Sequence, residues 1–213
     1  MKTNHLLILF SALVLLYAPS HIYAQRLQDT DKQKVIASIE AAAASIHSLQ
    51  CDFTQTKSLS LIKNKLNSQG RMYYKAGNQL RWEYTTPYTY LFILSNGKVT
   101  MRNSQKKTTS IDVKGSRLFQ EITNIMMSSV TGKCLSSKDF NVSILAHKDE
   151  WEAQLTPQKK EMKKMFSQIV LHINKEQKVV TRVDMKEQSG DLTTILLKNI
   201  KKNVQIQDNV FKL

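Results

Sequence analysis

The stretch SQGRMYYKAGNQLRWEYTTPYTYLFILSNGKVTM, residues 68–101, decides the fold of this chain. Its apolar and aromatic residues recur at every second position in successive segments, which is typical of β-strands with one buried face. Asn96-Gly97 is a strong signal for a two-residue hairpin, because both residues tolerate a positive φ. The stretch therefore predicts a meander of antiparallel strands that share a continuous apolar face.

Helical periodicity occurs on both sides of this meander. Before it, apolar residues recur at three- and four-residue spacing over residues 30–47, and Asp29 and Asp31 favour a helix start. After it, a second helix is predicted between Gly115 and Gly132, and its apolar face comprises Leu118, Phe119, Ile122, Ile125, Met126 and Val130. The apolar faces of both helices need an apolar partner to pack against, and the sheet is the only layer large enough to supply one.

Further segments alternate with period two outside the meander. They cover residues 49–55, 109–113, 140–146, 151–155, 169–173, 179–185 and 192–196. Residues 157–164 are expected to form a charged loop, and the end of the chain, Asp208 to Phe211, a tail that docks an aromatic side chain. Together these segments predict one α+β domain, in which a single curved antiparallel sheet of about eleven strands is closed by two or more helices.

The beginning of the chain has the pattern of a secretory signal peptide. Lys2 supplies the positive region, residues 6–16 the apolar region, and Ile22-Tyr23-Ala24 a cleavage site with a small final residue. The sequence thus predicts a signal peptide over residues 1–24 and an exported domain over residues 25–213. No cysteine follows the cleavage site, so lipid attachment at the new N-terminus is not expected.

The chain is strongly basic, with a formal net charge of +14 that includes one charge from Lys2 in the leader. Such a balance attracts anionic surfaces, phosphates or acidic partners. Nucleic acid is a poor candidate, because the sequence has no recognisable binding motif. The favoured interpretation is that lysine-rich edges and loops keep a β-protein soluble, and the second is attraction to anionic lipid head groups.

Cys51 and Cys134 are the two cysteines of the sequence. In an oxidising compartment they could form one disulfide. Cys51 shares strand parity with Leu49 and Phe53, so a small buried apolar residue is the alternative. The spacing of the two residues leaves this choice open.

Motifs for catalysis and cofactor binding are missing from the sequence. The six glycines are isolated from one another, no Gly-x-Ser-x-Gly elbow occurs, and the histidines have no metal-ligand spacing. Acidic pairs such as Asp149-Glu150 lie at predicted hairpin turns, where a solvated role is the simpler interpretation. We therefore expect a protein that is not an enzyme and that uses no cofactor or metal.

What remains is an apolar face that is rich in methionine and aromatic side chains. Met72, Met101, Met126 and Met127 fall in or near this face, and flexible thioether side chains adapt to varied apolar ligands. Methionine-filled cores are also common. The curved sheet could therefore be solid, or it could hold a cavity.

Several short motifs resemble those of one protein family. Phe53-x-Gln55, Gly70 and Leu80-Arg81-Trp82-Glu83-Tyr84 with Pro87 are similar to strand motifs of the periplasmic outer-membrane lipoprotein carrier protein LolA family. Ser95-Asn96-Gly97-Lys98 matches the family's hairpin at this place, and residues 166–173 with Glu187-x-x-Gly190-Asp191 resemble its later strands. The order of the elements agrees over nearly the whole of residues 25–213.

The resemblance implies an incomplete antiparallel β-barrel closed by helices, whose inner apolar cavity holds the acyl chains of lipoproteins that cross the periplasm. It implies a monomeric periplasmic carrier, loaded by an inner-membrane lipoprotein-releasing transporter and emptied by an outer-membrane acceptor. The residues expected to line the cavity are Met72, Tyr74, Leu80, Trp82, Tyr84, Phe92, Met101, Phe119, Ile122 and Met126. Leu80 is expected near the mouth of the cavity. Phe92 lines the cavity only if the even-numbered residues of the run 91–94 face inward, and this run is apolar on both parities.

Two alternatives stay open beside the carrier. One is a binder of another envelope lipid or glycolipid, and the other is an envelope-sensing domain with no carrier role. One departure from the family pattern bears on them. In the family an arginine follows the lysine that closes the second strand and holds the empty cavity shut, whereas here Ala76 follows Lys75.

Overall fold

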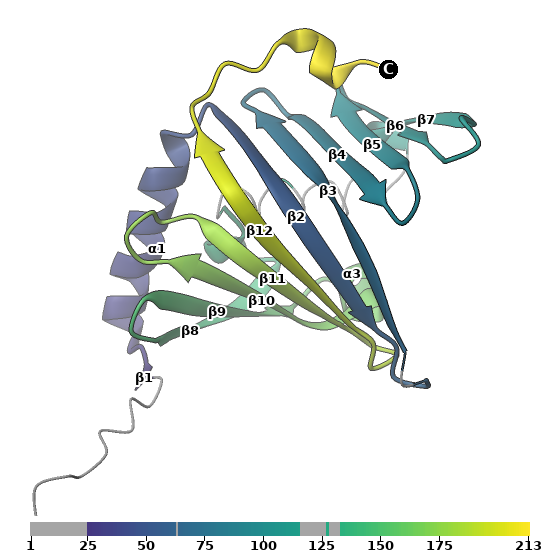
Figure 1. Cartoon of the computed structure of the whole chain (residues 1–213). Coiled ribbons are helices and arrows are strands. Elements are labelled where there is room, and N and C mark those ends of the chain that lie inside the picture. The colour runs from purple at the N-terminus through teal and green to yellow at the C-terminus, as the bar shows by residue number, and fades with distance from the viewer. Residues whose placement is uncertain (1–24, 63, 116–126, 128–132) are drawn as a thin grey trace, which may run out of the picture.

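The computed structural model describes residues 25–62, 64–115, 127 and 133–213. In this part of the chain twelve strands form one antiparallel sheet, in the order β1-β8-β9-β10-β11-β12-β2-β3-β4-β5-β6-β7 (Figure 1). The strands are β1 (Gln25–Arg26), β2 (Ser48–Ser58), β3 (Lys65–Lys75), β4 (Gln79–Thr86), β5 (Tyr90–Ser95), β6 (Lys98–Arg102), β7 (Thr108–Asp112), β8 (Phe140–Ala146), β9 (Glu150–Pro157), β10 (Phe166–Asn174), β11 (Val180–Glu187) and β12 (Leu192–Lys202). Among the described strands β1 and β7 are the edges, so the sheet is open.

Two helices and three short 3-10 segments accompany the sheet in the described part of the chain. They are α1 (Asp29–Ala44), α3 (Lys160–Met165), η1 (Val113–Gly115), η2 (Lys133–Leu135) and η3 (Asp208–Phe211). Ile36 and Ile39 of α1 and Met162 of α3 belong to the same apolar cluster on the sheet. The predicted fold class, an α+β protein with one curved antiparallel sheet and helices against it, is confirmed. None of the described helices is both long enough and apolar enough to span a membrane.

The meander over residues 68–101 forms β3 to β6 as the sequence predicts. Met72 lies opposite Trp82, Trp82 opposite Phe92, and Phe92 opposite Met101. The turns have the expected chemistry, because Asn96 and Gly97 adopt φ values of 51° and 73°, in the left-handed region that a two-residue hairpin requires. Paired strands thereby place alternate side chains in rows across the sheet.

The first helix begins at Asp29 and ends at Ala44, three residues earlier than the periodicity suggests. Asp29 and Asp31 lie in its first turn, where carboxylates interact favourably with the helix dipole. Ile36, Ile39 and Ala43 are buried, and Ile36 and Ile39 pack against the half of the sheet formed by β8 to β11. Ile46, beyond the helix, joins the other half of the core.

The prediction of a loop over residues 157–164 is wrong in part, because α3 starts at Lys160. Met162 is 1% exposed and Met165 is half-buried against the same cluster, so two apolar side chains at helical spacing turn inward while the lysines stay outside. The short amphipathic pattern is hard to recognise in the sequence, because half of the residues of α3 are lysines. Lys159 also forms an ion pair with Asp139, 3.0 Å apart, just before the helix starts.

The second predicted helix, between Gly115 and Gly132, falls almost wholly outside the described residues. Its predicted start, Gly115, is the last residue of η1, and the structure describes Met127 within the segment. Met127 is helical and partly buried, and it packs against the apolar cluster of β2 to β6. Its predicted place near the inner face is therefore confirmed.

Three apolar clusters form the described core. The first lies between the helices and β8 to β11, the second on the inner face of β2 to β6, and the third on the outer face of β5. Phe211, 3% exposed, belongs to the third cluster with Leu91 and Ile93, so the predicted docking of the tail is confirmed. Cys51 and Cys134 are both buried thiols, and because they lie in different clusters they do not form the disulfide that the sequence allows.

Candidate functional site

The inner face of β2 to β6 carries a layer of large apolar side chains, which we call the inner layer. Strand register arranges it in rows: Met72, Trp82, Phe92 and Met101 form one row, and Tyr74, Leu80, Leu94 and Val99 the next. Strand β2 extends both rows, because Cys51 lies opposite Met72 and Leu49 opposite Tyr74. Most of these residues are buried, whereas Met101 and Tyr84 at the margin are half-buried.

Aromatic contacts cross the layer beside these rows. The rings of Phe53 and Trp82 stack with centroids 4.2 Å apart, and Phe53 meets Tyr84 edge to face at 5.1 Å. Tyr84 in turn approaches Tyr90 at 6.4 Å. Such arrangements contribute beyond the apolar area that they bury, and they fix the orientation of the rings.

Gly70 makes room for this aromatic group. It lies opposite Phe53 on β2 and opposite Tyr84 on β4, next to a register shift between Gln69 and Gly70. A Cβ at this position would lie 1.8 Å from the carbonyl oxygen of Glu83 and 2.8 Å from Phe53 Cζ. Only glycine therefore lets the strands β3 and β4 and the Phe53 ring approach so closely.

Polar atoms in the layer are few and matched. The Tyr84 hydroxyl donates a hydrogen bond to Gln55 Oε1 at 2.9 Å, so the Phe53-x-Gln55 motif supplies both a ring contact and an acceptor. Burial raises the pKa of Tyr84 and that of Tyr74, because an ionised phenolate would lose its hydration. Burial also raises the pKa of the Cys51 thiol to about 12, which leaves it protonated and unreactive. The layer thus offers apolar contact, not acid–base chemistry.

The structure brings together the predicted residues that it describes. Met72, Tyr74, Leu80, Trp82 and Phe92 are buried in one cluster, with Tyr84 and Met101 packed against it. Their role in binding a ligand stays a prediction. Phe119, Ile122 and Met126 lie outside the described residues.

One expected placement is wrong, and one open question is settled. Leu80 is 0% exposed, so it lies deep in the layer and not near a mouth. Its partners on the two neighbouring strands, Tyr74 and Leu94, are buried as well. Phe92 does face inward, whereas Leu91 and Ile93 on the same strand face the C-terminal tail. The run 91–94 is apolar on both parities because both of its faces are covered.

Phe53, Leu94 and Val99 also belong to the layer, although the sequence prediction of the site did not include them. Phe53 has the correct parity on the first strand, and its motif was recognised. Its reach across β3 to Trp82 could not be read from the sequence, because that contact depends on the register of three strands.

The loop at Lys75 and Ala76 lies against the C-terminal end of the chain. Lys75 Nζ forms an ion pair with Asp208 at 2.5 Å, and the Ala76 N–H donates to the His47 carbonyl at 2.8 Å. Arg81 is on the outer face, where its Nη1 donates to the Val210 carbonyl at 3.1 Å. In the described part of the chain Lys75 and Arg81 therefore hold the C-terminal tail.

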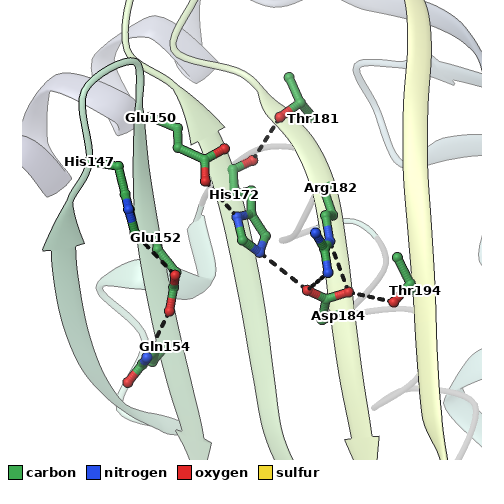
Figure 2. Close-up of polar contacts among 9 residues, drawn as sticks. All are labelled: His147, Glu150, Glu152, Gln154, His172, Thr181, Arg182, Asp184 and Thr194. Atoms are coloured by element: carbon green, nitrogen blue, oxygen red, sulfur yellow. Dashed lines mark hydrogen bonds and ion pairs between the residues drawn. The ribbon is translucent and has the colours of Figure 1, made fainter. Parts of the chain in front are cut away.

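A polar network covers the outer face of β9 to β12 (Figure 2). His172 lies between two carboxylates, with Nδ1 2.9 Å from Glu150 Oε1 and Nε2 3.2 Å from Asp184 Oδ2. Asp184 also accepts hydrogen bonds from Arg182 and Thr194. The sequence suggested a solvated role for Glu150 at a turn, but its carboxylate contacts the His172 ring instead. Among the described residues no group of histidine, cysteine and acidic side chains has the geometry of a metal site.

A separate pocket of about 290 Å³ lies between α1, β1 and β8. Its lining includes Arg26, Asp29, Lys32 and Ser143. This polar lining suits water or a small polar solute better than an apolar chain. The inner layer is therefore the stronger candidate site.

Comparisons with known proteins agree with this geometry. The family model for the outer membrane lipoprotein carrier protein LolA matches residues 44–213, which include every described strand except β1. The chain belongs to the LolA family. A relative, an outer-membrane lipoprotein carrier protein of Methylococcus capsulatus, is 21% identical over 191 residues, which cover 89% of this chain and 86% of that protein.

Two solved structures are similar to this chain. An uncharacterised conserved protein of Thermus thermophilus matches with a TM-score of 0.51 at 12% identity, covering 86% of this chain and 93% of that one. The lipoprotein LppX of Mycobacterium tuberculosis matches with a TM-score of 0.49 at 9% identity, covering 84% of this chain and all of that one (100%). At these identities the Thermus match concerns the fold alone.

Proposed function

We propose that residues 25–213 form a periplasmic carrier that shields the acyl chains of lipoproteins on the inner layer and moves them from the inner to the outer membrane. Residues 1–24 direct its export and are removed. An inner-membrane lipoprotein-releasing transporter loads it, and an outer-membrane acceptor empties it. It works as a monomer and catalyses no reaction.

One observation carries this proposal: the inner face of an open sheet in a LolA-family chain presents contiguous rows of methionine and aromatic side chains. Each CH₂ group that leaves water contributes about 0.8 kcal/mol, so a few acyl chains supply ample binding free energy. A carrier must also release its cargo. Flexible thioether side chains such as Met72 and Met101 suit this need, because they repack around different chains without a fixed complementary shape.

Release of lipoproteins from membranes tests the proposal. Met101 faces the layer but is half-buried, so its substitution should leave the fold intact. We expect Met101→Asp to reduce release from spheroplasts about tenfold or more, because acyl chains would desolvate the new carboxylate. The measurement is the amount of acylated lipoprotein in the soluble fraction, with a melting curve for each variant.

Ser110→Asp is the matched control. Ser110 lies on β7, on the opposite face of the sheet from Met101, and it is exposed. This variant adds the same charge and should release lipoproteins as the wild type does. Equal release by the wild type and the Met101 variant, with both proteins folded, would contradict the proposal.

A further inference from the structure

The connection between β2 and β3 carries Leu61, the most exposed large apolar side chain among the described residues, and two further exposed ones lie in it or next to it. Leu61 is 95% exposed and Ile62 53%, and Leu66 at the start of β3 is 55% exposed. We call Leu61, Ile62 and Leu66 the apolar tip. Large exposed aliphatic side chains that lie close together mark a surface that contacts a protein or a membrane.

Hydrogen bonds hold the connection in place. The Ser60 N–H donates to Asp191 Oδ1 at 2.9 Å, and the Ser60 hydroxyl donates to the Ser189 carbonyl at 2.8 Å. These bonds fasten the connection to the turn between β11 and β12, and both turns meet at one end of the sheet (Figure 1). The apolar side chains therefore project from a fixed support, at little further cost in conformational entropy.

Positive charge surrounds this tip. Lys65, Ser58, Leu192 and Lys186 lie side by side in one row of strand register, and both lysines are exposed. A third exposed lysine, Lys163 of α3, lies nearby, because the Gln188 side chain after β11 donates to its carbonyl at 2.7 Å.

The nearby acids are already engaged. Lys57 forms ion pairs with Glu187 at 2.7 Å and with Asp191 at 3.7 Å. Within the described residues Lys65 and Lys186 form no ion pair, so their charge faces solvent. The end of the sheet thus combines projecting aliphatic side chains with uncompensated cations.

We propose that this end of the sheet is a docking surface for an anionic lipid membrane. The apolar tip enters the boundary between head groups and acyl chains, while Lys65 and Lys186 bind lipid phosphates. Both contributions are needed, because basic residues attract an anionic surface only within a Debye length and apolar side chains then anchor it. This inference does not depend on the proposed cargo, since it concerns the empty protein.

Sedimentation with vesicles tests the docking surface. The exported protein, recovered from the periplasmic fraction, is mixed with vesicles of phosphatidylcholine alone or with added phosphatidylglycerol. We expect binding only with the anionic lipid. Leu61→Ser/Ile62→Ser should weaken it about tenfold or more, because burying one leucine alone changes partitioning by about tenfold. Tyr88→Ser, which changes a side chain that is 57% exposed on the turn between β4 and β5, should bind as the wild type does.

Two double variants, each lacking two lysines, distinguish binding by this surface from attraction due to the overall basic charge. Lys65→Gln/Lys186→Gln should weaken binding to the anionic vesicles about 25-fold, since each lysine at the surface contributes about fivefold. Lys107→Gln/Lys201→Gln removes the same charge from exposed sites elsewhere and should change binding much less. Equal losses in the two double variants would show non-specific attraction and would overturn the proposal.

Direct insertion is read from a fluorophore. Cys51 and Cys134 are buried, so Leu61→Cys can be labelled selectively with an environment-sensitive dye. We expect a blue shift of its emission with anionic vesicles and no shift when the dye is attached through Tyr88→Cys. An unchanged emission at position 61 in vesicle-bound protein would overturn the proposal. Capture of a second copy or of a protein partner by the tip, without vesicle binding, would overturn it as well.

Discussion

Phe53 on β2 stacks on Trp82 on β4 across the intervening strand β3, with ring centroids 4.2 Å apart and ring planes inclined by 29°. The contact is possible because β3 has glycine, Gly70, opposite Phe53. The stacked rings of Phe53 and Trp82, with glycine between them on β3, therefore fix the register of β2, β3 and β4 at this point. This relationship joins the first strand of the sheet to the meander and fixes one end of the inner layer.

The first prediction concerns Gly70. We expect Gly70→Ala to lower the free energy of unfolding by about 3 kcal/mol or more. Overpacking of a core usually costs about 1–3 kcal/mol, and here the backbone of β4 must also move. The new Cβ would meet the Glu83 carbonyl oxygen and the Phe53 ring. Chemical denaturation measures the loss. Gly115→Ala is the control, since a Cβ there meets nothing within 4 Å, and a similar loss in both variants would contradict the account.

The second prediction concerns Leu80. Because its side chain is fully buried, Leu80→Glu places a carboxylate where water cannot reach it. We expect a loss of about 3 kcal/mol or more in stability, and the protein should be recovered poorly at 37 °C. Leu80→Met, which keeps the volume, should cost less than about 1.5 kcal/mol. A stable, well-folded Leu80→Glu protein would place this residue at a rim instead.

The third prediction is a pH dependence of the C-terminal tail. The hydrogen bond and the charge of Lys75 lower the pKa of Asp208 below its ordinary value of 3.8. A lowered carboxyl pKa stabilises the folded state above the ordinary value, and that contribution is lost as the pH falls through the folded-state pKa. We expect Asp208→Asn to melt below the wild type at neutral pH and the gap to close in acid.

Asp149→Asn is the control for that titration, because the Asp149 side chain forms no ion pair within the described residues. At neutral pH its melting temperature should lie closer to that of the wild type than the melting temperature of Asp208→Asn does. A gap between Asp208→Asn and the wild type that is constant from neutral to acidic pH would show that the Lys75–Asp208 pair does not contribute through its charge.

The fourth prediction concerns thiol reactivity. With its pKa raised to about 12 by burial, Cys51 should resist alkylation in the folded protein at pH values where a free thiol reacts. Mass spectrometry after a brief iodoacetamide pulse should find Cys51 unmodified in the native protein and modified in urea. An intermolecular or intramolecular disulfide at Cys51 in the purified protein would contradict the buried-thiol description.

Period-two alternation was sufficient to predict the strands of the meander and the facing of Met72 and Trp82, but not that of Phe92, whose strand is apolar on both faces. The signal is strong there because one face of each strand is covered by core, and a slip of one residue would expose every apolar side chain. The sequence did not predict α3, because Met162 and Met165 are only two apolar residues among lysines. A helix this short depends on the core that receives it more than on its own propensity.

Contacts between distant segments could not be predicted from the sequence. The Glu150–His172–Asp184 network requires the register of β9, β10 and β11, which no local pattern specifies. The same holds for Arg81, whose partner, the Val210 carbonyl, lies far along the chain. The full burial of Leu80 likewise depends on the neighbouring strands. Its predicted place near the mouth of a cavity was taken from the family pattern, and so it was wrong.

The central claim is that acyl chains bind against the inner layer at Trp82. The sequence has two tryptophans, so Trp151→Phe leaves Trp82 alone and Trp82→Phe leaves Trp151 alone. Each protein is titrated with a lipopeptide whose acyl chains carry bromine, which quenches a tryptophan only at short range. The account predicts saturable quenching of Trp82 that is clearly stronger than that of Trp151. Unchanged Trp82 emission in protein that binds the lipopeptide, or quenching confined to Trp151, would contradict it.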